Sequence, residues 1–144
     1  MSVYTYPDLK PHSTKRVIIA GSRDYSGGID GVAAAVKASG FDIEVVLSGC
    51  ARGVDRCGEQ WAARHGIAIE TYPANWDKHG RGAGVIRNGK MAEKADALIA
   101  LWNGESPGTR DMIERMADKP TLVFWDVKWE IALQKQQRKI TGYL

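Results

Sequence analysis

Cysteine and long apolar runs are both scarce in this chain. Its 144 residues include two cysteines, Cys50 and Cys57, and no apolar run approaches the roughly 20 residues that a membrane-spanning helix requires. The first 15 residues lack the apolar centre of a secretory signal, so we expect a cytoplasmic protein with no membrane partner. Two cysteines without further ligands nearby make a poor zinc site. We therefore predict neither a metal site nor a cofactor.

A strong charge of one sign is also absent. Twenty basic residues stand against 17 acidic ones, which leaves a net charge of +3 and no long basic block. This mild excess suits a phosphate-bearing small molecule. Binding of single-stranded DNA requires a basic groove with aromatic stacking platforms, so nucleic acid is a possible but disfavoured partner.

Short β-branched or apolar runs alternate with amphipathic stretches along the chain. Strands are expected at residues 16–20, 43–47, 67–72, 96–102 and 121–125, and helices at 29–38, from after Asp55 to His65, at 85–95, 110–117 and 129–139. Residues 73–84 are expected to form a long polar loop. This alternation predicts an α/β fold with a Rossmann-like parallel sheet flanked by helices. We expect a single domain over residues 16–144, preceded by a flexible N-terminal tail over residues 1–15.

Glycine and polar residues follow three of the expected strands. They are Gly21, Ser22 and Arg23 after the first strand, Ser48, Gly49, Arg52, Gly53 and Asp55 after the second, and Gly104, Gly108 and Thr109 after the fourth. Ligands of open parallel sheets bind at the carboxyl ends of the strands, where glycine lets a phosphate approach the backbone and helix N-termini attract anions. The turns match neither the dinucleotide fingerprint nor the P-loop, so we predict neither NAD binding nor ATP hydrolysis.

Several of these side chains have two interpretations. Arg23 and Arg52 either clamp a phosphate or lie solvated on the surface, and we favour the clamp because both residues follow the ends of strands. Asp55 either binds a ribose hydroxyl or caps its helix. The hydroxyls of Ser22, Ser48 and Thr109 either donate to a phosphate or cap helices, and Trp76 in the long loop either stacks on a base or anchors that loop.

Five segments resemble the SLOG superfamily, specifically its YpsA-related branch of small phage and bacterial proteins. The segments are residues 21–25, 48–55, 86–91, 95–100 and 108–109. The resemblance implies a nucleotide-binding Rossmann-like domain that forms a homodimer. More distantly, the chain is similar to the Lonely Guy enzymes, which cleave the N-glycosidic bond of nucleoside monophosphates, and to the core of DprA, which binds single-stranded DNA.

The Lonely Guy resemblance bears on catalysis. Arg87, Asn88 and Met91 match its R-K-x-x-M segment, whereas Met112 stands where its P-G-G-x-G-T-x-x-E loop has the catalytic glutamate. The resemblance implies a catalytic role for Arg87, and the nearest acids to the missing glutamate are Asp111 and Glu114.

Three functions remain in order of preference. The first is a sensor or sequestering module that binds a nucleotide or nucleotide-derived phosphate ligand. The second is an N-glycosidase that hydrolyses a nucleoside 5′-monophosphate to base and ribose phosphate, with Asp111 or Glu114 assisting water. The third is binding of single-stranded DNA.

Overall fold

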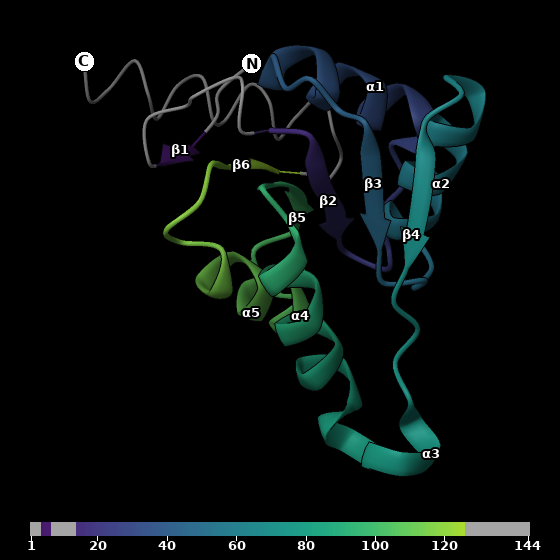
Figure 1. Cartoon of the computed structure of the whole chain (residues 1–144), viewed down its shortest axis with the longest axis vertical. Helices are drawn as coiled ribbons and strands as arrows, with labels where there is room; N and C mark the ends of the chain where they lie inside the picture. The colour runs from purple at the N-terminus through teal and green to yellow at the C-terminus, as the bar shows by residue number, and fades with distance from the viewer. Residues whose placement is uncertain (1–3, 7–13, 126–144) are drawn as a thin grey trace.

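The computed structural model describes residues 4–6 and 14–125, which form one six-stranded sheet with helices on both faces (Figure 1). The strands are β1 (Tyr4–Tyr6), β2 (Arg16–Gly21), β3 (Val45–Ser48), β4 (Ala68–Thr71), β5 (Ala97–Trp102) and β6 (Thr121–Trp125). The helices are α1 (Gly28–Ser39), α2 (Val54–Arg64), α3 (Trp76–His79), α4 (Ala83–Lys94) and α5 (Pro107–Arg115), with a 3₁₀ turn η2 (Gly80–Gly82) between α3 and α4.

Strand order confirms the predicted Rossmann-like sheet. The order is β1-β6-β5-β2-β3-β4, and β2 to β6 pair in parallel. From β2 the chain moves outward to β3 and β4, and it then returns through α4 to β5 on the other side of β2. Strand order therefore reverses between β2 and β5, which is the position where open α/β sheets hold their ligands.

Alternation along β2 divides the core into two layers. Val17 and Ile19 belong to the cluster that includes side chains of α1 and α2, whereas Ile18 belongs to the cluster that includes Met91 of α4 and Met112 of α5. All three β2 side chains are completely buried. Burial of such a side chain contributes roughly 1.5–3 kcal/mol, so the two layers hold the central strand in place from both faces.

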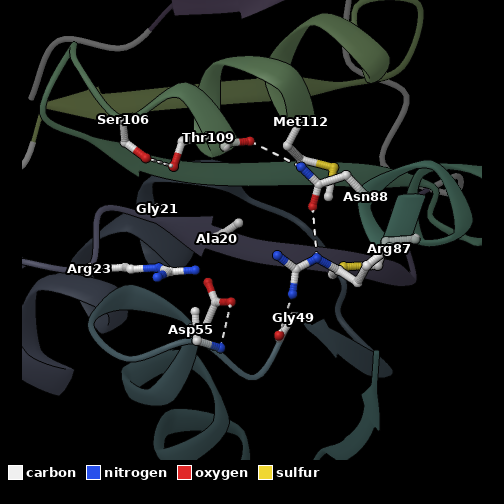
Figure 2. A pocket seen from close by; sticks show the side chains of 13 residues that line it. Ala20, Gly21, Arg23, Gly49, Asp55, Arg87, Asn88, Ser106, Thr109 and Met112 are labelled. Atoms are coloured by element: carbon white, nitrogen blue, oxygen red, sulfur yellow. Dashed lines mark hydrogen bonds between the residues drawn. The ribbon is translucent and has the colours of Figure 1, made fainter. Parts of the chain in front are cut away.

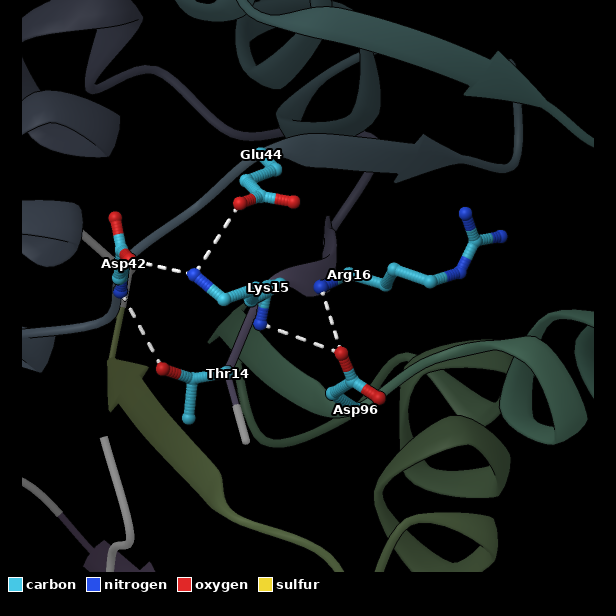
Figure 3. A network of polar contacts seen from close by, with 6 residues as sticks. All are labelled: Thr14, Lys15, Arg16, Asp42, Glu44 and Asp96. Carbon is cyan, nitrogen blue, oxygen red and sulfur yellow. Dashed lines mark hydrogen bonds and ion pairs between the residues drawn. The ribbon is translucent and has the colours of Figure 1, made fainter. Parts of the chain in front are cut away.

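The amino end of β2 is held by a polar network (Figure 3). The Asp96 carboxylate accepts hydrogen bonds from the backbone N–H groups of Lys15 and Arg16, at 3.3 and 3.0 Å. The Lys15 ammonium forms ion pairs with Asp42 at 2.8 Å and Glu44 at 3.2 Å, and these contacts raise its pKa. The network fixes the start of β2, at the end of the sheet opposite to the carboxyl ends of the parallel strands.

The structure differs from the sequence expectation in two segments. Residues 73–84 are not simply a loop, because they contain α3 and η2, and the Asn75 side chain caps α3 by accepting a hydrogen bond from the Lys78 N–H at 3.1 Å. Figure 1 shows α3 and the start of α4 projecting away from the sheet. Within the expected N-terminal tail, Tyr4–Tyr6 instead forms β1, which pairs antiparallel with β6. Three residues are too few for a periodicity to be recognised in sequence.

Two further expectations concern the ends of helices and the membrane. Helix α5 begins at Pro107 rather than at residue 110, since proline is well accommodated in a first helical turn.

The helix expected at residues 129–139 lies outside the described residues. In the described ranges, no helix has the length and apolar character needed to span a membrane.

Candidate functional site

A cavity of about 70 Å³, here called the inner cavity, lies where the strand order reverses (Figure 2). Its walls come from the ends of β2 and β3, from the loop before α2, from α4 and from the start of α5. The lining residues are Ala20, Gly21, Arg23, Gly49, Ala51, Asp55, Arg87, Asn88, Met91, Ser106, Gly108, Thr109 and Met112. Eight of the residues predicted to form the site are among them: Gly21, Arg23, Gly49, Asp55, Arg87, Asn88, Gly108 and Thr109.

Two guanidinium groups reach the inner cavity from opposite sides (Figure 2). Arg87 is held in place because its Nη1 donates to the Gly49 carbonyl and its Nε donates to Asn88 Oδ1 at 3.0 Å. Its remaining nitrogen, Nη2, and the whole guanidinium of Arg23 make no hydrogen bond to the described residues. Burial lowers the pKa of Arg87, which increases the benefit of an anionic partner. These free N–H groups are available to a ligand.

Asp55 is the buried acid of the inner cavity. Its side chain is 6% exposed, and its Oδ2 accepts a hydrogen bond from the Ala51 N–H at 3.2 Å. Its other oxygen has no hydrogen-bond partner, and Asp55 forms no ion pair, among the residues that the structure describes. Burial is the main cause that raises its pKa from 3.8 to about 6, and Arg87 and Arg23 counteract that rise. The carboxyl group therefore changes charge close to neutral pH, inside the cavity.

Asn88 connects α4 to α5. It is buried, and its Nδ2 donates to the Gly108 carbonyl at 3.1 Å and to Asp111 Oδ2 at 3.0 Å. The same carboxylate oxygen of Asp111 accepts from Arg115 Nε at 2.9 Å. Asp111 lies behind Asn88 and does not line the inner cavity. It therefore orients Asn88, which in turn orients Arg87.

A larger cavity of about 440 Å³ adjoins the inner one and is here called the tryptophan cavity. It shares Arg23, Arg87, Asn88, Ser106 and Gly108 with the inner cavity, and its outer wall consists of Trp76, Arg81, Gly84, Val85 and Pro107. Trp76 is 51% exposed, so much of its ring surface is free of contacts with the rest of the protein. Trp76 stands in a short helix, α3, rather than in the open loop that the sequence suggested.

Two comparisons place the chain among known proteins. The model of the YspA, cpYpsA-related SLOG family matches residues 15–79. The chain is also 35% identical over 123 residues to the Gene 61 protein of Mycobacterium phage D29, and this match covers 78% of the chain and 98% of the phage protein. The chain belongs to this SLOG family. No solved structure matches the chain significantly.

The stretch of the SLOG domain that matches the family model contains the loop between β3 and α2, where packing requires glycine at two positions. Gly53 has φ +79°, and a Cβ there would lie 2.3 Å from the Ser22 carbonyl oxygen. Gly49 lies directly against the functional side chains, because a Cβ would approach Arg87 Nη1 at 2.7 Å and Asp55 Oδ2 at 2.9 Å. Gly53 therefore brings the start of α2 against the turn after β2, whereas Gly49 leaves room for Arg87 and Asp55.

The remaining predicted residues of the SLOG domain do not line the inner cavity or the tryptophan cavity. Ser22 Oγ accepts from the Asn103 N–H at 2.9 Å, and Ser48 Oγ donates to Glu59 at 2.6 Å, so both hydroxyls are used within the protein. The others are Arg52 and Glu114, which are exposed, Gly53, Gly104, which packs against Trp125, and Asp111. Ser22, Arg52, Gly53 and Gly104 do follow strands, but whether such a residue faces the cavity depends on local turns that the sequence does not reveal.

The sequence also missed contributors to the site. Met91 and Met112 form part of the inner wall and are almost fully buried, and Ser106 precedes α5 at the rim. Both methionines were named in the sequence only for their places in the Lonely Guy resemblance, because an apolar side chain on a helix gives no sign that it lines a cavity. In the described ranges no group of three or more His, Cys, Asp or Glu side chains is arranged to hold a metal ion.

Proposed function

We propose that this SLOG domain binds a nucleotide or a nucleotide-derived phosphate ligand in the inner cavity. The observation that carries the proposal is the convergence of Arg23 and Arg87, with unused N–H donors, on a small cavity beside glycine backbone. A guanidinium matches phosphate oxygens in a bidentate manner, and such charge-assisted hydrogen bonds are strong where water is excluded. A volume of about 70 Å³ suits a compact anionic group rather than a whole nucleotide.

The start of α5 supports the same placement of the phosphate. Gly108 and Thr109 lie in the first turn of this helix and line the inner cavity. Backbone N–H groups of a first helical turn have no partner within the helix, and the helix dipole adds partial positive charge there. The Thr109 hydroxyl is within 3.2 Å of Ser106 Oγ, so the two side chains form a polar rim beside these N–H groups.

The remainder of a nucleotide fits the neighbouring groups. Trp76 offers an exposed ring in the tryptophan cavity, on which a base can stack. Asp55 offers a buried acceptor oxygen that can receive a hydrogen bond from a ribose hydroxyl. That bond would replace the hydrogen bonds to water that the carboxylate loses on burial. The ligand would then bridge the inner cavity and the tryptophan cavity.

Binding without turnover is the preferred form of this proposal. Met112, which occupies the position of the Lonely Guy glutamate, is buried in the wall of the inner cavity and offers no acid or base. Glu114 is exposed and Asp111 is engaged with Asn88 and Arg115, so neither acid faces the inner cavity. A sensor or a sequestering module needs no such group.

Hydrolysis of the N-glycosidic bond is the second candidate, and Asp55 is the observation that favours it. A carboxyl group with a pKa of about 6 inside a cavity is suited to take a proton from water as water attacks the sugar carbon. The proton that Asp55 takes from water would then pass to the leaving base as its bond to the ribose breaks, which restores the carboxylate and leaves free base and ribose phosphate. This candidate replaces Asp111 and Glu114 with Asp55 as the acid-base group.

One experiment separates the two candidates and tests the proposal. The full chain is incubated with a panel of nucleoside 5′-monophosphates and nucleotide-derived signals, and thermal stabilisation and released base are measured in the same samples. Stabilisation without released base supports the binding module. Base release that Asp55→Asn abolishes supports the glycosidase, and neither stabilisation nor release across the panel contradicts both.

A further inference from the structure

A third cavity lies between the end of β4, α3 and α4 and is here called the lysine cavity. Its volume is about 270 Å³, and it is lined by Thr71, Tyr72, Pro73, Asn75, Lys78, His79, Ala83, Ile86, Arg87 and Lys90. Arg87 lines all three cavities, and it is the only residue that the lysine cavity shares with the other two. Arg87 therefore stands at the junction of two outer compartments and the inner cavity.

The charge of the lysine cavity points to an anionic occupant. Lys78, Lys90 and Arg87 contribute three cationic side chains. No aspartate or glutamate belongs to its lining. Cationic groups gathered around a concave surface without acids attract phosphate rather than a neutral molecule.

The exposed apolar side chains gather at the same two outer compartments. Among the described residues, four large hydrophobic side chains are exposed, and three of them line these cavities. Trp76 and Val85 line the tryptophan cavity, and Ile86 lines the lysine cavity, where the Tyr72 ring is a further apolar surface. Each outer compartment thus combines an aromatic ring, an aliphatic side chain and cationic groups, which is the combination that binds bases together with their phosphates.

We infer that the ligand is a dinucleotide that extends across Arg87, with one nucleotide unit in the tryptophan cavity and the other in the lysine cavity. This inference rests on the proposed function and specifies its ligand class. A mononucleotide occupies one outer compartment and leaves the cations and the exposed ring of the other unmatched. A dinucleotide satisfies both compartments in one binding event, so the second unit adds affinity without a second loss of translational freedom.

The test compares matched ligands by isothermal titration calorimetry on the full chain. The four nucleoside 5′-monophosphates and the four corresponding 5′-phosphorylated homodinucleotides are titrated at one ionic strength. The best-bound dinucleotide is expected to bind at least about tenfold more tightly than its mononucleotide, a difference of about 1.4 kcal/mol. The double variant Lys78→Ala/Lys90→Ala is expected to reduce that ratio to below about threefold, because phosphate contacts of two lysines are lost.

A matched control removes two lysines that line none of the three cavities. The double variant Lys37→Ala/Lys94→Ala changes the net charge by the same amount, and it is expected to retain the wild-type ratio. Lys78 and Lys90 are exposed side chains with no hydrogen bond from their ammonium groups to the described residues, so the test variant is expected to fold, which circular dichroism checks.

Two results would overturn the inference. The first is equal affinity of the wild type for dinucleotides and mononucleotides, and the second is a ratio that survives Lys78→Ala/Lys90→Ala. If equal affinity is found together with a dimer in sedimentation, a second copy of the chain accounts for the exposed apolar side chains. Mononucleotide binding without a dinucleotide preference leaves the proposed function standing, whereas the absence of binding by every ligand removes both.

Discussion

Replacement of Asp55 by asparagine is expected to make the protein less sensitive to pH. Asparagine keeps an oxygen that can accept the hydrogen bond from the Ala51 N–H, but it cannot become charged. In the wild type the folded-state pKa of about 6 lies above the ordinary value of 3.8, because burial penalises the carboxylate. The folded protein therefore binds more protons than the unfolded chain between these two values, so the wild type loses stability as the pH rises through them.

The magnitude follows from the difference between the two pKa values of Asp55. The interval from 3.8 to about 6 corresponds to about 3 kcal/mol of unfolding free energy, fully present below pH 3.8 and lost above pH 6. About 2 kcal/mol of this change falls between about pH 4.5 and about pH 7.5, where a folded domain is convenient to study. The free energy of unfolding of Asp55→Asn, relative to wild type, should increase by that amount across this interval.

Urea denaturation of both proteins across this pH interval measures the effect. The quantity of interest is the difference between the two unfolding free energies at each pH, since other titrating groups contribute equally to both proteins. A difference that stays constant with pH would refute the claim that burial raises the pKa of Asp55. Carboxyl-carbon NMR of the wild type provides an independent titration of the same group.

Three further predictions concern single residues. Gly53→Ala is expected to lower the free energy of unfolding in urea by at least about 3 kcal/mol, because this position combines a positive φ with a close backbone contact. Gly66→Ala, with φ +64° and open space around it, should lower it by about 1 kcal/mol. Equal losses in the two variants would contradict the packing argument. Trp76→Ala should weaken nucleoside monophosphate binding by about tenfold while affinity for ribose 5-phosphate stays unchanged, and equal weakening of both would argue against stacking. Asp111→Ala should weaken nucleotide binding through loss of its hydrogen bond to Asn88, and retention of full affinity would show that Asn88 does not need it.

The fold was predictable because its core strands carry strong local signals. The apolar runs that form β2, β5 and β6 and the glycine turns that follow β2 and β5 are sufficient to indicate a parallel sheet from the sequence alone. Strand β1 and helix α3 were missed for different reasons. A three-residue edge strand has no measurable period, and a four-residue helix depends on the single cap supplied by Asn75.

The site was only partly predictable. Sequence position located the turns after β2, β3 and β5, and these turns do surround the inner cavity. It did not distinguish a side chain that faces the cavity from one that faces away, so Arg23 and Arg52 looked equivalent although Arg52 lines none of the cavities described above. It also gave no indication that Asp111 lies behind Asn88, because that contact joins α4 to α5 across 23 residues.

Calorimetric titration of the best-stabilising nucleotide into three single variants tests the central claim most directly. Arg23→Ala and Arg87→Ala each remove a donor from the inner cavity, and each is expected to weaken binding by about 1.5–3 kcal/mol, or at least about tenfold. Arg52→Ala removes the same charge from a neighbouring exposed position and is expected to bind like the wild type. Equal weakening by all three variants, or full affinity in Arg87→Ala, would contradict the placement of the phosphate between Arg23 and Arg87.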